Sequence, residues 1–316
     1  MITSTGKAQR VVFGEMLVEL GEQNERVVVL DADVSCSTQT RLFGERFPDR
    51  FFNMGICEAG MVSTAAGLAA SGYIPVVSTF ALFIAMRAGD QVRSQVAYPN
   101  LNVKLVGGYA GLSDFADGAS HQSVEDISVM RAIPNMTVIS PSDIVTTRLA
   151  LSAMLDHEGP VFLRISRDTV NALYPHDHPF KIGKATTARD GRDVTIISTG
   201  AMFQACQAAT DSLNEKGISA RLIDMHTIKP LDTVCVQSAA RETGAIVTVE
   251  EHSIHAGLGS AVCETVCASC PVPVIRVGIP DRFGETGAYH TILERAGLTP
   301  AHIINAAENA IAAKGD

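Results

Sequence analysis

A single carboxylate separates a predicted strand from a predicted helix in the segment Met54-Gly55-Ile56-Cys57-Glu58-Ala59-Gly60-Met61. The residues before it, Arg50 to Met54, are typical of a strand, and Ala59 to Ala70 form a helical run made almost wholly of small residues. A helix of small residues lets backbone or a flat ligand approach closely. Ligands of open parallel sheets bind beyond the carboxyl ends of strands. Glu58 is therefore a candidate site residue, although a favourable interaction with the positive end of a helix dipole would also explain it.

The composition of the chain limits the class of protein. Its 316 residues are 46% hydrophobic and 19% charged, with 26 Gly and no Trp, as in a globular α/β protein of about two domains. The net charge is -9 and no run is rich in Lys or Arg, so we expect no nucleic-acid partner. No apolar run reaches the roughly 18 residues of a membrane span, and Met1 to Lys7 lack the apolar core of a signal peptide. We therefore expect a cytoplasmic protein without membrane contact.

Strand-like and helical runs alternate along the chain, which predicts parallel sheets with helices on both faces. The strands predicted in the first half are Arg26–Leu30, Phe51–Met54, Ile74–Ser78, Asn102–Val106, Thr137–Ser140 and Val161–Ile165. Those predicted in the second half are Val194–Ser198, Ser219–Ile223, Ala245–Val249 and Val272–Val277. The predicted helices include Ile84–Ala97, Ile144–Leu155, Met202–Glu215, Thr233–Glu242 and Ser260–Ala268. A polar, Pro-containing segment, Tyr174 to Pro179, separates the halves. We expect two doubly wound α/β domains, residues 1–175 and 176–316.

Seven scattered cysteines, an odd number, disfavour a disulfide framework. Three of them, Cys263, Cys267 and Cys270, have the spacing of iron–sulfur ligands in radical enzymes. They fall in a helical pattern, in which the same spacing marks one buried face. We therefore interpret them as buried apolar residues and expect no metal ligand in this chain.

Polar and aromatic residues follow several of the predicted first-half strands. They are Asp33 and Ser37 after the first strand, Phe80 and Phe83 after the third, Asp117 and His121 in a long polar loop after the fourth, and Arg167 after the last. Taken singly, each has a simpler explanation, as a core ring, a hydrogen-bonded loop residue or a surface charge. The two Phe residues, three positions apart, would share one helical face. Because the carboxyl ends of parallel strands meet at one edge of a sheet, we expect these side chains to build one pocket.

The chain resembles the C-terminal half of transketolase over nearly its whole length. Met54 to Glu58 resembles the segment with the family's catalytic glutamate, and Thr79 to Phe83 resembles the aromatic wall of its pyrimidine pocket. Asp117 to Gln122 is similar to its substrate-hydroxyl loop. Two segments, Asp224 to Asp232 and Gly278 to Glu285, are similar to its C-terminal domain. The resemblance implies the small subunit of a split transketolase that uses thiamine diphosphate to move a two-carbon ketol unit from a ketose, expected to be phosphorylated, to an aldose.

The resemblance also implies roles for the candidate residues. Glu58 would share a proton with a ring nitrogen of the cofactor's aminopyrimidine, and burial against the two Phe rings would favour its neutral acid. The other implied cofactor contacts are Asp33, Phe80, Phe83 and Met86. The implied substrate contacts are Ser37, Asp117, His121 and Arg167, and His121 would also relay a proton.

Three positions depart from the family pattern. Gly6 stands where an Arg is expected and Tyr109 where a His is expected, while Met86 replaces an aromatic residue. The Gly-Asp-Gly and Asn-Asn motifs that hold Mg²⁺ and the diphosphate are absent from the sequence. The resemblance therefore implies a separate partner, an N-terminal-half transketolase subunit that carries the Mg²⁺ ligands, in an assembly with two copies of each chain.

Two other enzymes of the same cofactor class remain alternatives: a 1-deoxyxylulose-5-phosphate synthase-like protein and the β subunit of a 2-oxo acid dehydrogenase. Pyruvate-dependent release of CO₂ would favour either of them over ketol transfer. An alternative of another class is a non-catalytic regulatory or binding subunit. A carboxylate placed against two Phe rings costs free energy unless it is used, which argues against that third reading.

Overall fold

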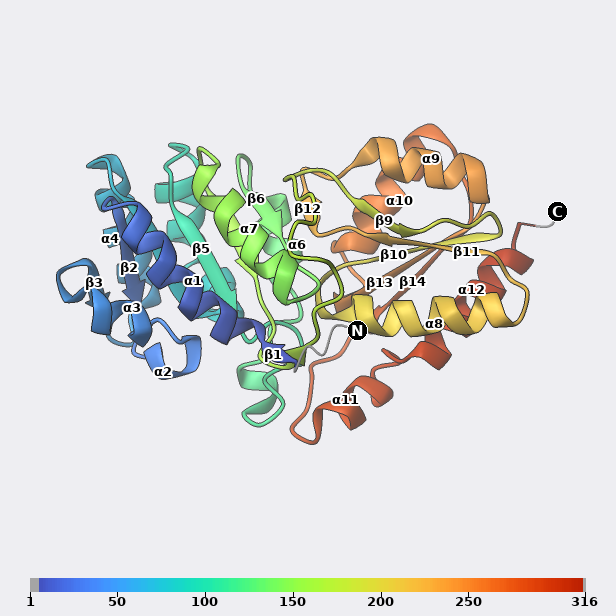
Figure 1. Ribbon diagram of the computed structural model, residues 1–316, viewed down its shortest axis with the longest axis horizontal. Helices are drawn as coiled ribbons and strands as arrows, with labels where there is room; N and C mark the ends of the chain where they lie inside the picture. The colour runs from blue at the N-terminus through green and yellow to red at the C-terminus, as the bar shows by residue number, and fades with distance from the viewer. Residues whose placement is uncertain (1–5, 315–316) are drawn as a thin grey trace.

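Two mainly parallel sheets organise the chain in the computed structural model, which describes residues 6–314 (Figure 1). The first sheet lies in the half coloured blue to green and the second in the half coloured yellow to red. Each sheet has helices on both faces, so the predicted fold of two doubly wound units is confirmed.

The first sheet has seven strands in the order β12-β6-β7-β5-β4-β2-β3. Its strands are β2 (Val27–Asp31), β3 (Phe51–Asn53), β4 (Ile74–Phe80), β5 (Lys104–Gly108), β6 (Thr137–Ile139), β7 (Val161–Arg164) and β12 (Thr227–Lys229). The four central strands are buried throughout, as expected for parallel strands covered on both faces. The register pairs Asp31 with Asn53 on one side and with Ser78 on the other. The carboxyl ends of β2, β3 and β4 therefore lie next to one another.

The edge strand β12 comes from the second half of the chain. It pairs antiparallel with β6, with Thr227 opposite Ile139 and Lys229 opposite Val138. The backbone N–H of Ser140 donates to the carbonyl of His226 at 2.8 Å, which extends this connection. The second half thus completes the sheet of the first.

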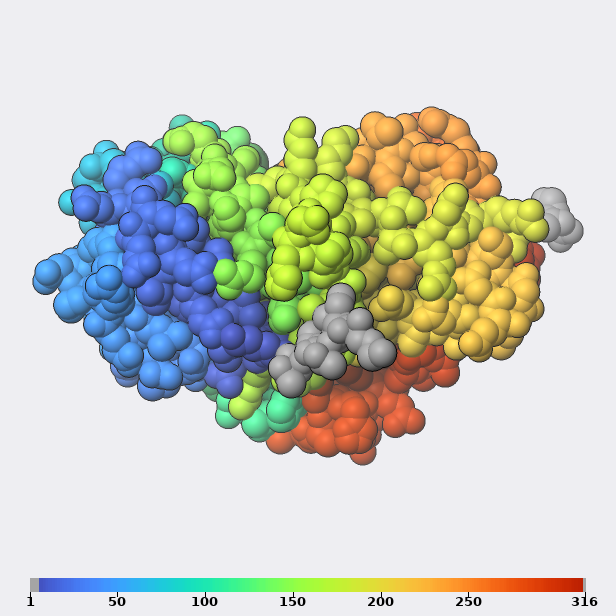
Figure 2. Space-filling model, viewed as in Figure 1, coloured from blue at the N-terminus to red at the C-terminus, as the bar shows by residue number. Residues whose placement is uncertain are grey.

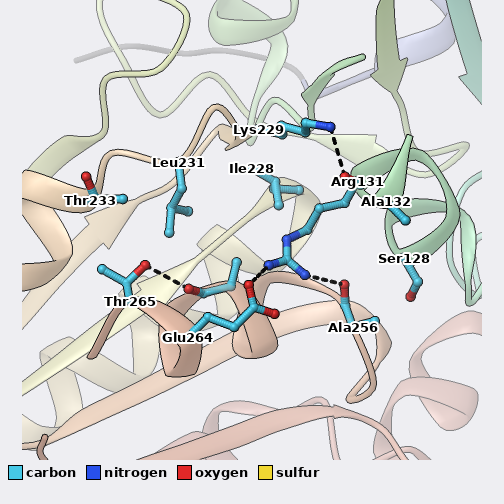
Figure 3. A pocket seen from close by; sticks show the side chains of 11 residues that line it. Ser128, Arg131, Ala132, Ile228, Lys229, Leu231, Thr233, Ala256, Glu264 and Thr265 are labelled. Atoms are coloured by element: carbon cyan, nitrogen blue, oxygen red, sulfur yellow. Dashed lines mark hydrogen bonds and ion pairs between the residues drawn. The ribbon is translucent and has the colours of Figure 1, made fainter. Parts of the chain in front are cut away.

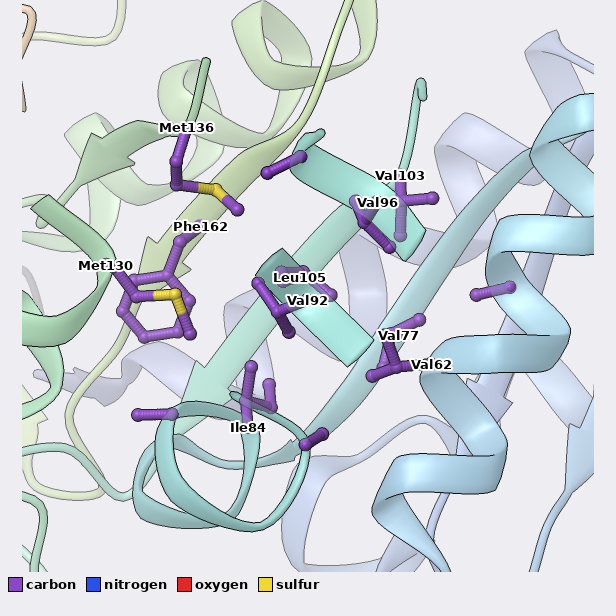
Figure 4. Close-up of a cluster of buried hydrophobic side chains, with 14 of the residues drawn as sticks. Val62, Val77, Ile84, Val92, Val96, Val103, Leu105, Met130, Met136 and Phe162 are labelled. Carbon is purple, nitrogen blue, oxygen red and sulfur yellow. The ribbon is translucent and has the colours of Figure 1, made fainter. Parts of the chain in front are cut away.

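Helices cover the first sheet on two faces with separate apolar cores. One face carries α1 (Gln9–Gln23), α3 (Arg41–Arg46) and α7 (Ile144–Asp156). The other carries α4 (Glu58–Ala70), η2 (Phe83–Arg87), α5 (Gly89–Gln91), η3 (Val92–Ala97) and α6 (Asp126–Ala132). Figure 4 shows Val62, Ile84 and Met130 of this second face around Val77 and Leu105 of the sheet. Short elements connect these layers: α2 (Ser35–Thr38), η1 (Pro48–Arg50), η4 (Gly118–Ser120) and the pair β1 (Lys7–Ala8) with β8 (Thr169–Val170).

The predicted helical segment Ile84–Ala97 is helical apart from Ala88, but it is not one regular α-helix. Two π-helical segments, η2 and η3, flank the short helix α5, which begins at Gly89. A π-helical turn holds one residue more than an α-helical turn and is frequent at functional sites. The apolar pattern of this segment indicates its buried face but carries no sign of the wider turns.

The second sheet has the order β14-β13-β10-β11-β9. Its strands are β9 (Thr186–Arg189), β10 (Val194–Ser198), β11 (Ala220–Asp224), β13 (Ile246–Ser253) and β14 (Val274–Ile279), of which only β9 is antiparallel to its neighbour. One face carries η5 (Gly200–Met202), α8 (Phe203–Glu215), α11 (Tyr289–Arg295) and α12 (Pro300–Ala312), and the other carries α9 (Thr233–Thr243) and α10 (Leu258–Ser269). The short strands β1, β8, β9 and β12 were not predicted, since none has an extended apolar pattern.

The predicted boundary after residue 175 falls in the segment that connects the two halves, and it stays a prediction. Figure 2 shows this yellow-green segment on the surface between the two halves. Tyr174 is buried there, with its ring stacked 5.6 Å from that of Phe203 and 4.1 Å from that of His178. The connection is therefore packed against the second half.

The cysteine pattern lies on a helix, as predicted, but not on one buried face. Cys263 and Cys267 belong to α10 and Cys270 follows its end, and Cys267 is exposed. Across residues 6–314, no three His, Cys, Asp or Glu side chains are grouped so that they could hold a metal ion. In the same part of the chain, no helix is long and apolar enough to cross a membrane.

Candidate functional site

Four rings gather at the carboxyl end of the first sheet. Phe80, the last residue of β4, stacks on Phe83 at 5.7 Å and on Tyr109 at 4.3 Å between ring centroids. The imidazole of His121 meets both Phe rings edge-on, at 5.8 and 5.4 Å. The prediction that the two Phe residues share a helical face is wrong, because Phe80 lies in a strand, but their rings do form one wall.

Glu58 is the first residue of α4 and only 5% of it is exposed. Its carboxylate accepts a hydrogen bond from Arg87 Nη1 at 3.0 Å. The guanidinium of Arg87 also covers the ring of Phe83, with its Cζ atom 3.8 Å from the centroid. Glu58 is therefore joined to the aromatic wall through an arginine that the sequence did not indicate.

The loop after β2 is fixed by a buried aspartate. Asp31 accepts from the backbone N–H of Val34 at 2.7 Å and from the hydroxyls of Thr38 and Thr40, each at 2.8 Å. Burial raises the pKa of Asp31, and these hydrogen bonds oppose that shift. The loop that Asp31 holds carries two of the predicted site residues, Asp33 and Ser37.

The chain between these two residues reaches the aromatic wall. Val34, between them, packs against the cluster of Phe80, Phe83 and Tyr109. Asp33 is exposed and accepts from Asn53 Nδ2 at 3.0 Å. The carbonyl of Ser37 lies 3.5 Å from the Tyr109 hydroxyl. The polar loop and the rings therefore form one continuous surface.

Two arginines flank Tyr109. Arg167 follows β7, and its Cζ atom lies 5.0 Å from the Tyr109 centroid. Arg10, on α1, places its Cζ atom 5.8 Å from the same centroid and donates from Nη1 to the Ser37 carbonyl at 3.0 Å. Arg10 also has a buried Nε without a hydrogen-bond partner.

Arg10 supplies a cation near Gly6, the position at which the family pattern has an Arg and this sequence has none. A Cβ atom at Gly6 would lie 2.7 Å from Thr169 Cγ2, so there is no room for a side chain there. Arg10, four residues later, brings a guanidinium to the cluster instead. Arg10 lies on the first turn of α1, and no local sequence pattern indicates that it reaches this cluster.

The loop with Asp117 and His121 is held by the second half of the chain. Asp117 is exposed, and Gly118 after it has a φ of 78°, where an added Cβ would lie 2.3 Å from Thr286 Oγ1. Gln122 Nε2 donates to the Glu285 carbonyl at 3.0 Å. The segment Gly278 to Glu285 of the second half is therefore the support of this loop. Met86, by contrast, is 50% exposed and lies outside the ring cluster.

A buried network ties the same loop to β13. Arg164 Nε donates to Asp126 Oδ2 at 2.8 Å, and Arg164 Nη2 donates to the Glu251 carbonyl at 2.7 Å. The Glu251 carboxylate accepts from the backbone N–H of Leu112 at 2.7 Å and from the Tyr289 hydroxyl at 2.9 Å. Burial raises the pKa of Glu251 to about 7, against an ordinary value of 4.5. The two halves therefore share an acid that is easily protonated.

We expect Glu251 to make stability depend on pH. Because its pKa is raised in the folded state, the folded chain binds the proton more tightly than the unfolded chain does. The contribution of Glu251 to the free energy of unfolding is fully present below the pKa of Glu251 in the unfolded chain, and it is lost as the pH rises through about 7. The free-energy difference between wild type and Glu251→Gln in urea unfolding should change by about 2–3 kcal/mol between roughly pH 5 and 8. The exposed Glu25→Gln variant should follow the wild type, and a constant wild-type-minus-E251Q difference would contradict the assignment.

A cavity of about 460 Å³ lies away from the ring cluster, between α6, β12 and α10 (Figure 3). None of the predicted site residues lines it. Arg131 is ion-paired with Glu264, and Lys229 Nζ donates to the Arg131 carbonyl at 3.0 Å. Arg131, Glu264 and Lys229, which line the cavity, are therefore paired with groups of the protein itself. The candidate site remains the ring cluster.

Comparison with known proteins gives the same two halves. Residues 6–172 match the family "Transketolase, pyrimidine binding domain" and residues 183–303 match "Transketolase, C-terminal domain". The chain is 44% identical to a putative transketolase C-terminal section of Methanocaldococcus jannaschii, covering 92% of each chain. It is 41% identical to the 6-deoxy-6-sulfo-D-fructose transketolase subunit SqwH of Clostridium sp. (strain MSTE9), covering 94% of this chain and 92% of that one.

A solved structure agrees with both. It is described as a split-gene transketolase, an inactive β4 tetramer, and it superposes with a TM-score of 0.92 at 44% identity, covering 98% of this chain and 100% of the other. The pyrimidine-binding family alone accounts for more than half of the residues. The chain therefore belongs to the transketolase family.

Proposed function

We propose that the chain is one subunit of a thiamine diphosphate-dependent transketolase, which moves a two-carbon ketol unit from a ketose to an aldose. The observation that carries this proposal is the position of Glu58, a buried carboxylate at the start of a helix, linked through Arg87 to the wall of Phe80 and Phe83. Relatives of the same length that are described as transketolase subunits or sections support it.

The residues present fit the pyrimidine end of the cofactor. A flat heterocycle needs an apolar wall, which the stacked rings of Phe80 and Phe83 provide. It also needs an acid for its ring nitrogen, and Glu58 is a buried acid linked to that wall through Arg87. When bound, thiamine diphosphate supplies the carbon nucleophile that attacks the ketose carbonyl.

The residues of this chain divide the remaining work. Glu58 holds a proton at the ring nitrogen, Asp33 and Met86 border the cofactor, and the aromatic wall excludes water. Asp117 and His121 hold sugar hydroxyls, and His121 moves a proton to and from the reacting oxygen. The distal end of the sugar lies toward Ser37 and Arg167, with Arg10 as a third contact.

The diphosphate end of the cofactor needs groups from another polypeptide. We propose that a partner of the N-terminal-half type carries Mg²⁺ and its ligands, in a cytoplasmic assembly of two copies of each chain. The reason is electrostatic: a diphosphate needs cations or backbone N–H groups, and the sequence lacks the Gly-Asp-Gly and Asn-Asn motifs.

Calorimetry tests this division of the site. We expect the chain alone to give no saturable heat with micromolar thiamine diphosphate and Mg²⁺, because the ring contacts alone do not offset the loss of freedom on binding. Adding the partner should produce both binding and ketol transfer. Micromolar binding with turnover by the chain alone would overturn the split site, and pyruvate-dependent CO₂ release in place of ketol transfer would replace transketolase by the other enzymes of this cofactor class.

A further inference from the structure

The aromatic wall of the candidate site is closed in this chain. Phe80 and Phe83 are only 6% and 7% exposed, and Glu58 is only 5% exposed. A flat ligand can stack on a ring only where a face of that ring is open to it. A side chain of the protein must therefore move before the wall and the acid can receive a heterocycle together.

Arg87 is the side chain that covers both of them. Its Nη1 donates to Glu58 Oε1 at 3.0 Å, and its Cζ atom lies 3.8 Å from the centroid of the Phe83 ring. A separation of 3.8 Å is direct van der Waals contact, so no second flat group fits between the guanidinium and the ring. Arg87 thus makes the two contacts, one with the wall and one with the acid, that the proposed function assigns to a cofactor ring.

The contact between Arg87 and Glu58 competes with the proposed role of that acid. A guanidinium is planar and has only hydrogen-bond donors, so it holds Glu58 as an acceptor. A ring nitrogen that shares a proton with Glu58 needs the same carboxyl group as a donor. The pair of Arg87 and Glu58 must therefore separate when Glu58 takes up its proposed role.

Arg87 is the member of this group that can leave. Its side chain is 52% exposed, whereas Glu58 and Phe83 are buried. A side chain that is already half in water loses little when it turns fully outward. Arg87 is also the last residue of η2, and a Cβ atom added at Gly89, two residues later, would meet no other atom within 4 Å. There is therefore open space beside the end of this segment.

We propose that Arg87 occupies the place of the aminopyrimidine ring in the free chain and is displaced when that ring binds. This inference rests on the proposed function, which assigns Glu58 and the two Phe rings to the cofactor. Arg87 does not touch the reacting atoms. It keeps the site closed and the carboxyl group paired, so the apparent dissociation constant rises by the factor by which the closed state is favoured over the open one.

The first test measures binding to the full chain without turnover. The probe is 4-amino-5-hydroxymethyl-2-methylpyrimidine, the ring part of the cofactor without thiazolium or diphosphate, and saturation-transfer NMR follows it. Arg87→Met should bind the probe about tenfold more tightly than the wild type, because an ion pair and a cation–π contact that oppose binding are both removed. Arg87→Lys keeps the charge but has no flat guanidinium, and its affinity should lie between the two.

Arg41→Met is the matched control. It also removes a guanidinium paired with a carboxylate, that of Glu45, at an exposed position on another helix. It should bind the probe as the wild type does, and equal midpoints of urea unfolding for Arg41→Met and Arg87→Met would show that both variants keep the fold. Adding Glu58→Gln to Arg87→Met should weaken the gained binding, which places the probe at Glu58.

The second test uses the complex of the chain with its partner and Mg²⁺. Calorimetry with thiamine diphosphate should give a dissociation constant about tenfold lower for Arg87→Met than for the wild type. If neither complex binds thiamine diphosphate, the proposed function fails. If both bind it, but Arg87→Met binds the probe and the cofactor no more tightly than the wild type or more weakly, the displacement of Arg87 is overturned and the proposed function stands.

Discussion

Glu58→Gln should lower the kcat of the reconstituted complex by roughly 10²–10⁴-fold, the range typical of a lost general acid–base group. The amide has the same shape as the carboxyl group but cannot exchange a proton with a ring nitrogen. Because α4 is packed by Met61, Val62 and Ala65 rather than by Glu58, the variant should fold and assemble normally. Steady-state kinetics and size-exclusion chromatography of the complex measure the two effects separately.

A matched control is Glu45→Gln, which also removes a helical carboxylate paired with an arginine, Arg41, but at an exposed position. It should keep wild-type activity. Activity of Glu58→Gln within about tenfold of wild type would contradict the assigned role, and it would favour a non-catalytic subunit. Loss of the complex together with activity would indicate a structural role for Glu58 instead.

Asp126→Asn should be the most destabilising single substitution considered for this chain, with a loss of about 3–5 kcal/mol. Asp126 is fully buried and its partner Arg164 is almost fully buried. Removing the carboxylate leaves a guanidinium in the interior without its closest counter-charge, and the cost of a buried unpaired charge is high. Urea unfolding measures the effect.

The same substitution should lower activity, because Arg164 also fixes the Glu251 carbonyl beneath the loop of Asp117 and His121. Asp190→Asn, which breaks an exposed pair with Arg221, should change stability little. A loss below about 1 kcal/mol for Asp126→Asn would mean that the Glu251 carboxylate alone compensates Arg164.

The sequence predicts the elements that depend on long patterns. The small residues of Ala59–Ala70 predict α4 and place Glu58 at its start, and the apolar runs predict the four central strands of the first sheet within one or two residues. The convergence of Phe80, Phe83 and His121 follows from strand ends of one parallel sheet, and the structure places these three in contact. Their roles in catalysis stay predictions.

The parts of the site that the sequence does not predict depend on contacts between distant segments of the chain. Arg10 and Arg87 lie on helical segments whose pattern reports only which face is buried, so nothing local indicates that they reach Tyr109 and Glu58. The π-helical turns of η2 place Arg87 over Phe83, and a regular helix was expected there. The Asp114–Arg167 pair joins residues 53 positions apart, a distance that no sequence period encodes.

Strand β12 couples the unfolding of one half of the chain to that of the other. Without the polypeptide beyond residue 175, β6 would present a bare row of amide and carbonyl groups on that side, which is a template for cross-chain aggregation. Unfolding of the C-terminal half removes this partner strand, so the amide proton of Ser140, which donates to the His226 carbonyl, should exchange with deuterium no more slowly than the C-terminal half unfolds. The two halves share one hydrogen-bonded sheet edge, so an unrelated domain could replace one half only if it also paired with this edge.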